Sequence, residues 1–409
     1  MKYSLCNNWE FTEIWSDAFC TGAPVPCQAV RLPHTCRELP LHYADPADYE
    51  MVCGYRRTLT LPDAPRLFLR FDGAAHQAAV YLNGQLVGEH LGGYTAFALE
   101  ITNFVHRDAE NLLAVRLDTR EDTALPPFGF VIDYLTYGGL YREVWLETTA
   151  ATCVTDLFVH TPTLTEAAVS VTTDAPEKAA VLRVSLCAPD GAALVGQQLP
   201  AAAKAECTLT LPDAQPWGTD HPNLYTCRAE LLDAAGQVLD CRETTFGFRT
   251  AEFKADGFYL NGKKTFLRGL NRHQSYPYIG YAAPESLQRN DARILKNELH
   301  CNAVRTSHYP QSQHFLDECD KLGLLVFTEL PGWQHIGDAA WKDRACEMLR
   351  EMIMQNRSHP SIILWGVRIN ESVDDDEFYN RTNKIAHELD PSRATSGVRY
   401  LEKSHLLED

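Results

Sequence analysis

The chain has 409 residues, enough for about three domains. Its 54 acidic and 37 basic side chains give a formal net charge of −17, which argues against nucleic acid or an anionic membrane as a partner. No stretch of about 18 apolar residues occurs, and the first residues contain no apolar signal core. The 13 cysteines are scattered without CxxC pairs, so they predict reduced thiols in the cytoplasm and neither a zinc site nor a disulfide framework.

Residues 1–150 have the pattern of an all-β domain. Runs at 79–87, 111–118 and 142–148 alternate between apolar and polar side chains, which is typical of strands with one buried face. Asn83-Gly84, in the first of these runs, is the strongest short signal for a hairpin. Many short strands separated by Gly and Pro turns predict a β-sandwich of jelly-roll type.

Residues 151–250 continue the alternating pattern, with another turn at Asp190-Gly191. Roughly seven short strands within about 100 residues predict an immunoglobulin-like β-sandwich. This segment lacks a cluster of titratable side chains, so we interpret it as a spacer that braces its neighbours.

Residues 251–409 change from strand periodicity to alternating strands and helices. Apolar stripes predict helices, and short apolar runs between them predict strands. The first strand is expected from Phe266 and a fifth from Ala394, with the other strands at 302–305, 324–328 and 361–365 and the helices at 287–299, 315–322, 341–353 and 378–389. This order indicates parallel βαβ units and the N-terminal half of a (β/α)8 TIM barrel. A closed barrel has eight strands, so we expect the chain to be a fragment of a longer protein, or its open edges to be covered.

Polar side chains follow the predicted barrel strands. Since parallel strands point the same way, side chains at their carboxyl ends converge on one cleft. A carboxylate, imidazoles, amides and an indole together suit a sugar ligand. In chain order, the candidates are Asn271, His273, His308, Trp333, His335, Asn370 and Glu371.

Glu371 is the one convincing catalytic candidate, although glycosidases generally use two carboxylates. Taken singly, Glu371 could be a solvated loop acid, and each histidine could be a hydrogen-bonded structural residue. Glu329 also ends a predicted strand, but a structural pair with a barrel arginine is the favoured interpretation. Asp133 lies among many aromatic residues at 128–141 and needs a separate explanation.

Three short runs of the barrel resemble glycoside hydrolase family 2, which contains β-galactosidases, β-glucuronidases and β-mannosidases. These runs are LRGLNRH at 267–273, AVRTSHYP at 303–310, and RSHPSIILW at 357–365 followed by Asn370-Glu371. YGGLYREV at 137–144 extends the resemblance over the whole chain. The resemblance implies a jelly roll, an immunoglobulin-like domain and a (β/α)8 barrel, in agreement with the pattern of the sequence.

The resemblance also implies roles for individual residues. Glu371 would be the acid/base, Asn370 would bind the sugar 2-hydroxyl, and His273 and His308 would line the sugar subsite. Asp133, six residues before Gly139, would reach into the barrel from the first domain, although it could instead order its own loop. Asn271, Trp333 and His335 would complete the substrate-binding set.

Two features depart from the family pattern. The β-galactosidases with a catalytic-site magnesium offer a Glu-x-His pair after the third strand, but here Trp333 precedes His335 in the position of the Glu. An indole cannot ligate a hard cation, so we predict neither a metal nor another cofactor; Trp333 could stack on a sugar or pack against its own loop. The family stretch Trp-Ser-x-Gly-Asn-Glu is also one residue longer here, from Trp365 to Glu371, and Glu371 is correctly assigned if the extra residue is absorbed before Asn370.

The resemblance predicts a retaining exo-β-galactosidase acting on terminal β-glycosides, with its two carboxyl groups roughly 5 Å apart. The nucleophile is expected beyond Asp409, so the chain alone should be inactive. One alternative is a β-glucuronidase, and another is a non-catalytic carbohydrate-binding remnant. The partner expected is a carbohydrate, without nucleic acid or membrane, and a homo-oligomer stays open.

Overall fold

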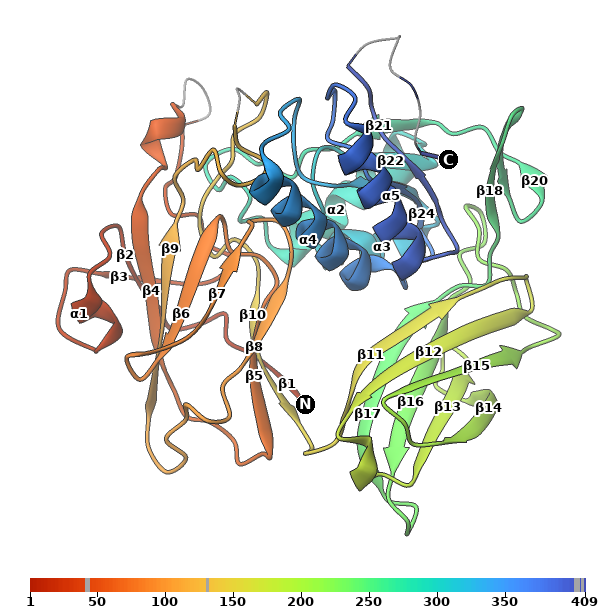
Figure 1. The fold of residues 1–409 in the computed structure, drawn as a ribbon, viewed down its shortest axis with the longest axis horizontal. Coiled ribbons are helices and arrows are strands. Elements are labelled where there is room, and N and C mark those ends of the chain that lie inside the picture. The colour runs from red at the N-terminus through yellow and green to blue at the C-terminus, as the bar shows by residue number, and fades with distance from the viewer. Residues whose placement is uncertain (41–44, 130–131, 401–404, 406–407) are drawn as a thin grey trace.

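The computed structural model of the chain describes residues 1–40, 45–129, 132–400, 405 and 408–409. Two β-sandwiches flank an α/β part that carries most of the helices (Figure 1). This is the predicted multidomain class. Among the described residues, every helix is too short or too polar to cross a membrane.

The first sandwich consists of two antiparallel sheets. One sheet has the order β1-β10-β5-β8 and the other has the order β3-β2-β4-β9-β6-β7. Asn83 and Gly84 both have positive φ angles, 54° and 77°, and they form the predicted hairpin turn between β6 and β7. The bounds are β1 (Lys2–Ser4), β2 (Trp9–Thr12), β3 (Gln28–Val30), β4 (Val52–Leu59), β5 (Arg66–Phe71), β6 (Gln77–Leu82), β7 (Gln85–Leu91), β8 (Phe97–Glu100), β9 (Asn111–Asp118) and β10 (Val144–Thr149), with the short helices α1 (Asp17–Cys20) and η1 (Pro46–Asp48).

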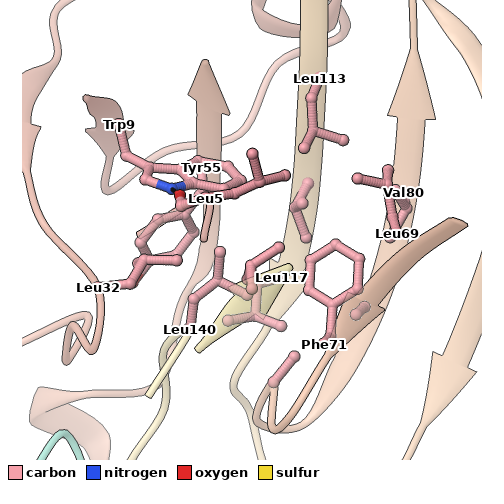
Figure 2. Close-up of a cluster of buried hydrophobic side chains, with 14 of the residues drawn as sticks. Leu5, Trp9, Leu32, Tyr55, Leu69, Phe71, Val80, Leu113, Leu117 and Leu140 are labelled. Atoms are coloured by element: carbon pink, nitrogen blue, oxygen red, sulfur yellow. Dashed lines mark hydrogen bonds between the residues drawn. The ribbon is translucent and has the colours of Figure 1, made fainter. Parts of the chain in front are cut away.

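The core of this sandwich lies between its two sheets. Inward-facing residues of β5, such as Leu69 and Phe71, meet Val80, Leu113 and Leu117 of the opposite sheet, and all are fully buried (Figure 2). The alternation that predicted the strands is therefore the alternation between core and solvent.

The second sandwich also has two antiparallel sheets, as expected for an immunoglobulin-like domain. Their orders are β11-β12-β15 and β14-β13-β16-β17. The bounds are β11 (Cys153–His160), β12 (Glu166–Asp174), β13 (Val181–Cys187), β14 (Ala193–Pro200), β15 (Lys204–Thr210), β16 (Tyr225–Leu232) and β17 (Val238–Phe246), with η2 (Pro176–Lys178) between β12 and β13.

A small hairpin sheet leads into the α/β part, whose sheet has the parallel order β21-β22-β23-β24-β25. These are five strands of the barrel, and the helices between them make the expected βαβ units. The bounds are β18 (Ala251–Lys254), β19 (Gly257–Leu260), β20 (Lys263–Lys264), β21 (Gly269–Asn271), α2 (Glu285–Arg293), η3 (Ile294–Glu298), β22 (Ala303–Thr306), α3 (Gln313–Leu322), β23 (Leu325–Glu329), α4 (Ala339–Asn356), β24 (Ile362–Gly366), α5 (Asp376–Leu389) and β25 (Ala394–Ser396).

The first barrel strand begins later than the sequence predicts. β21 starts at Gly269 instead of Phe266, and the Phe266 side chain is 81% exposed. In the described sheet β21 pairs only with β22, so residues 266–268 have no second neighbour to draw them into a ladder. The first barrel helix also differs, because α2 passes into the π-helical turn η3 before its predicted end.

The first sandwich docks onto the carboxyl end of the barrel sheet. Tyr94 stacks on Tyr309 with ring centroids 4.5 Å apart, and Tyr281 Oη donates to the carbonyl oxygen of Leu135 over 2.8 Å. The buried Arg142 donates from Nη2 to Gln274 Oε1 and to the Pro310 carbonyl oxygen, at 3.1 and 2.8 Å. These contacts attach the first sandwich to the loops that follow β21 and β22.

Candidate active site

Parallel pairing aligns the carboxyl ends of the barrel strands. Asn271 at the end of β21 lies beside Arg305 of β22, and Glu329 at the end of β23 lies beside Gly366 of β24. The side chains that follow these ends therefore meet above one edge of the sheet, as the sequence predicted.

A buried hydrogen-bond network joins three of these strand ends. Arg305 donates from Nε and Nη2 to the two carboxylate oxygens of Glu329, both over 2.9 Å. His308 Nδ1 lies 2.7 Å from Glu329 Oε1, and Arg305 Nη2 also donates to Asn370 Oδ1 over 2.6 Å. Glu329 is 2% exposed. Glu329 therefore forms the expected ion pair with a barrel arginine, Arg305. His308 and Asn370 belong to the same hydrogen-bond network.

The two predicted histidines lie next to each other. The ring centroids of His273 and His308 are 5.4 Å apart, and His273 Nδ1 lies 3.0 Å from the Tyr309 hydroxyl. Burial, followed by the nearby His308, lowers the pKa of His273, while Asp133 acts in the opposite direction. The lowered pKa of His273 favours its neutral form.

The first sandwich contributes a wall to this cleft. The Tyr134 ring lies 5.4 Å from His273, 6.0 Å from His308 and 5.3 Å from Tyr309, measured between centroids. Its hydroxyl is buried without a hydrogen-bond partner in the described part of the chain, and burial raises the pKa of Tyr134. The adjacent Asp133 is exposed and acts electrostatically on His273. The residue after Asp133 therefore contacts the barrel, and the role of Asp133 itself stays a prediction.

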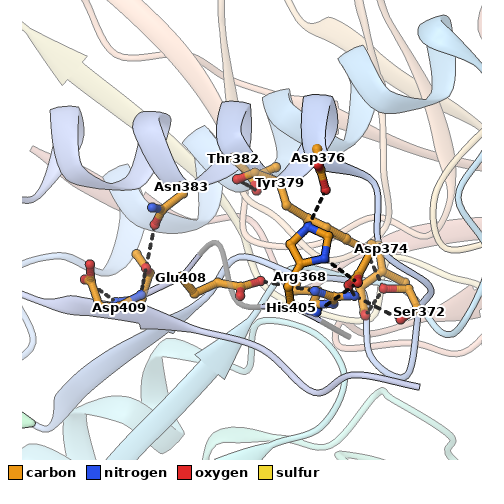
Figure 3. Close-up of polar contacts among 12 residues, drawn as sticks. Arg368, Ser372, Asp374, Asp376, Tyr379, Thr382, Asn383, His405, Glu408 and Asp409 are labelled. Atoms are coloured by element: carbon orange, nitrogen blue, oxygen red, sulfur yellow. Dashed lines mark hydrogen bonds and ion pairs between the residues drawn. The ribbon is translucent and has the colours of Figure 1, made fainter. Parts of the chain in front are cut away.

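The side chains of Arg368 and Asn370, both in the stretch from Trp365 to Glu371, have different partners. Arg368 is turned away from the cleft and under α5, where Nη2 donates to Asp374 Oδ1 over 2.5 Å and the guanidinium lies 4.5 Å from the Tyr379 ring (Figure 3). Asn370 nevertheless reaches Arg305 in the cleft. The assignment of Glu371 stays a prediction.

Glu371 has a left-handed backbone conformation, with φ of 53°. Such a conformation is uncommon for a residue with a Cβ, and it turns the chain sharply between Asn370 and Ser372. Its amide donates to the Val398 carbonyl oxygen over 2.8 Å, and Gln334 Nε2 donates to Glu371 Oε2 over 3.2 Å. The carboxylate is half-buried and is held by the loop that follows β23.

The loop after β23 places Trp333 beside Asn370, with which it forms an isolated parallel bridge. Trp333 Nε1 is buried and lacks an acceptor among the described residues. His335 lies against Gly129, where a Cβ would come within 2.1 Å of the imidazole, and edge-on to Trp341 at 5.7 Å. Because the indole offers only a donor, the residues here do not fit the magnesium site of the related β-galactosidases.

One other group of side chains could be considered for a cation. Asp317, Asp320 and His359 have ligand atoms within 4.8 Å of one another in the described structure. Both ring nitrogens of His359 are already hydrogen-bonded, Nδ1 to Asp320 at 2.5 Å and Nε2 to Gln313 at 3.1 Å. We therefore interpret this group as a buried structural ion pair.

The sequence did not identify Arg305, Tyr134 or Gln334 as residues of the site. Arg305 lies within the AVRTSHYP run and Tyr134 directly follows Asp133, so a neighbouring sequence feature could have pointed to each of them. Gln334 had none, since its contact with Glu371 joins two different loops.

Three sequence profiles match the chain: "Glycosyl hydrolases family 2, sugar binding domain" over residues 30–150, "Glycosyl hydrolases family 2" over 152–249, and "Glycosyl hydrolases family 2, TIM barrel domain" over 251–407. The chain belongs to glycoside hydrolase family 2.

The chain is similar to enzymes of more than one specificity. A β-galactosidase of Thermoanaerobacterium thermosulfurigenes is 44% identical over 421 residues, covering 98% of this chain and 58% of the relative. A putative β-glucuronidase of Formosa agariphila is 33% identical over 406 residues, covering 93% and 48%. The apo structure of β-glucuronidase 3 from Bacteroides uniformis superposes with a TM-score of 0.87 at 31% identity, covering 97% of this chain and 55% of that one. The chain spans about half the length of the curated relatives it matches.

Proposed function

We propose that the whole protein is a retaining exo-β-glycosidase of the β-galactosidase type. The observation that carries this proposal is the hydrogen-bonded group at the strand ends: Asn370 accepts from Arg305, which lies beside His308, and Glu371 directly follows Asn370, in a chain of this family. Family membership supports the reaction class. The 44% identity to a β-galactosidase supports the sugar.

In this proposal Glu371 protonates the leaving oxygen and later deprotonates the attacking water. Asn370 binds the sugar 2-hydroxyl, supported by its buried Nδ2, which has no partner within the described residues. His273 and His308 hold other hydroxyls, and Asp133 approaches from the first sandwich. Asn271, Trp333 and His335 line the outer part of the same cleft.

The nucleophile is proposed to come from chain outside residues 1–409, because Glu329, the other acid at a strand end, is occupied by Arg305 and His308. A retaining mechanism then proceeds through a covalent glycosyl-enzyme intermediate. We further propose domain bounds of 1–150, 151–250 and 251–409. The cytoplasm is the proposed compartment, supported by 13 cysteines that are all free thiols.

The direct test is hydrolysis of 4-nitrophenyl β-galactoside by the purified whole protein, compared with Glu371→Gln, in which the second step should be slower because its general base is missing. Retention is measured by NMR of the first anomer released. We expect the β-anomer of galactose before mutarotation. The α-anomer, or equal rates for the two proteins, would contradict the proposal. Light scattering on the same sample measures the oligomeric state.

A second candidate is a β-glucuronidase, because the Formosa agariphila relative and the Bacteroides uniformis structure carry that name. The same assay with 4-nitrophenyl β-glucuronide separates the two. A higher kcat/KM on the glucuronide would replace the galactosidase assignment while leaving the roles of Glu371 and Asn370 unchanged.

A further inference from the structure

Glu329 is surrounded by donors on both sides of its carboxylate. Oε1 receives Arg305 Nη2 at 2.9 Å and His308 Nδ1 at 2.7 Å, while Oε2 receives Arg305 Nε at 2.9 Å. The group is 2% exposed, so water contributes little to its solvation. A buried carboxylate with this set of partners is held as an acceptor in one orientation.

This arrangement decides which nitrogen of His308 carries the proton. Arg305 Nη2 lies 3.2 Å from His308 Nδ1, but a guanidinium can only donate, and it already donates to Glu329. His308 Nδ1 must therefore carry a hydrogen to bond to Glu329 Oε1 at 2.7 Å. In the neutral ring, Nε2 is then an acceptor, suited to a hydroxyl that donates.

The same carboxylate acts on Asn370 through Arg305. Arg305 Nη2 donates to Asn370 Oδ1 over 2.6 Å, which fixes the orientation of the amide. Asn370 Nδ2 is then left as a buried donor that no described residue accepts from, and Asn370 is 2% exposed. His308 Nε2 is thus available as an acceptor and Asn370 Nδ2 as a donor. Glu329 fixes the first directly and the second through Arg305.

We propose that Glu329 is a positioning residue that fixes the tautomer of His308 and the amide orientation of Asn370 for a sugar with vicinal hydroxyls. The sugar in this statement rests on the proposed function, whereas the tautomer and the amide orientation rest on the network alone. Of two vicinal hydroxyls, one can donate to His308 Nε2 and the other can accept from Asn370 Nδ2. Glu329 itself does not touch the reacting atoms.

The first test is the side-chain ¹H–¹⁵N NMR spectrum of the 409-residue chain with labelled histidine. His308 is assigned by the signal lost in His308→Asn. In the wild-type chain we expect the Nδ1–H tautomer at neutral pH, and in Glu329→Gln a rise in the Nε2–H form, because the charge that favoured Nδ1–H is gone. A wild-type Nε2–H tautomer, or an unchanged spectrum in Glu329→Gln, would overturn the proposal.

Glu318→Gln is the matched control. Glu318 is a buried glutamate, 5% exposed, which pairs with Arg289 and Arg293 at 3.2 and 2.7 Å on the helices α2 and α3. Its substitution removes the same charge from a buried double ion pair without touching His308, so the His308 signal should stay unchanged. If Glu329→Gln does not fold, Glu329→Asp keeps the charge but withdraws it by one methylene, and the same rise in the Nε2–H form is expected.

The second test uses the whole protein and aryl β-glycosides. We expect Glu329→Gln to lower kcat/KM about 100-fold, from the loss of oriented hydrogen bonds, and Glu318→Gln to lower it less than about twofold. An inactive wild-type protein would refute the proposed function and leave the NMR result standing. If the Nε2–H form of His308 rises in Glu329→Gln but kcat/KM stays unchanged, the positioning role of Glu329 is refuted while the proposed glycosidase activity stands.

Discussion

Gln334 Nε2 donates to Glu371 Oε2 over 3.2 Å, joining the loop after β23 to the loop after β24. The contact holds the proposed acid/base from the side, in a residue whose backbone is left-handed. The position of the carboxylate therefore depends on two loops at once.

We predict that Glu371→Gln slows the whole enzyme strongly for poor leaving groups. Activated aryl glycosides need little protonation, so their first step should slow much less. Azide should rescue the second step, because a small anion needs no general base. Pre-steady-state rates on a series of aryl glycosides measure both steps. An equal loss for every leaving group, with no response to azide, would remove Glu371 from this role.

Trp333 gives a prediction about metal and sugar binding. We expect activity to survive exhaustive EDTA treatment, since the indole removes an anionic ligand from the magnesium position. Trp333→Ala should raise KM about fivefold and change kcat less, corresponding to the loss of about 1 kcal/mol of contact. Trp333→Phe keeps the ring but loses the unpartnered Nε1 donor, so it separates stacking from hydrogen bonding. Loss of activity that returns with micromolar magnesium would contradict this prediction.

Two histidines of the first sandwich, His34 and His76, predict that the folded state loses stability in acid. Burial lowers the pKa of His76, which is 2% exposed, to about 4, and it lowers the pKa of His34 to about 4 as well. In the unfolded chain these groups titrate near the ordinary value of about 6.5, so the unfolded state binds more protons between these pH values. The stabilisation is therefore complete above pH of about 6.5 and is lost as the pH falls toward 4, by about 3 kcal/mol for His76.

Thermal unfolding between pH 7 and pH 4 measures this effect. His76→Gln keeps a donor for the Thr136 carbonyl oxygen, which lies 2.9 Å from His76 Nε2, but it removes the titrating group. Its unfolding temperature should fall less steeply with acid than that of the wild type. His106→Gln, on an exposed histidine, should follow the wild type. Parallel slopes for the wild type and His76→Gln would show that His76 does not contribute.

Arg142 should matter for both stability and substrate affinity. Arg142→Lys replaces the guanidinium, whose Nη2 donates to both Gln274 and Pro310, with an ammonium group that cannot keep the same geometry. We therefore expect the free energy of unfolding to fall by about 2–4 kcal/mol. KM should rise as well, because those two partners lie in the loops of His273 and His308. Urea unfolding and kinetics measure the two effects, and Arg183→Lys, at an ion pair on the surface of the second sandwich, should cost less than about 1 kcal/mol.

The 409-residue chain by itself should not hydrolyse aryl β-galactosides at a useful rate. Glu329, the other acid at a strand end, is bonded to Arg305 and His308, so it is not free to act as the nucleophile. The measurement is turnover by the purified chain from a host without its own β-galactosidase. Sustained turnover would show that a nucleophile lies within these residues.

The sequence predicted the layers of this fold because its signals are local. Alternation in β9 (Asn111–Asp118) and the Asn83-Gly84 turn act within a few residues. The predicted start of β21, at Phe266, was wrong because the extent of an edge strand depends on pairing with a neighbouring strand. Likewise, the path of Arg368 under α5 depends on Asp374 and Tyr379, which no period in the sequence encodes.

The candidate site divides in the same way. Its barrel residues follow from strand ends, and the geometry brings His273, His308 and Asn370 together. Tyr134 could not be found from periodicity, since its place results from docking between two separately folded units.

If the proposed function is correct, the contacts of Tyr134 with His273 and His308 make substrate affinity depend on how the first sandwich packs against the barrel. A tilt of the first sandwich by a small angle would withdraw the ring from His273 and His308 while each body stayed intact. Substitutions far from the cleft, along the line where the sandwich meets the barrel, would then change affinity without touching any residue that a sugar contacts. Under the proposed function, affinity for a new glycan could therefore change through this interface while the residues at the strand ends stay the same.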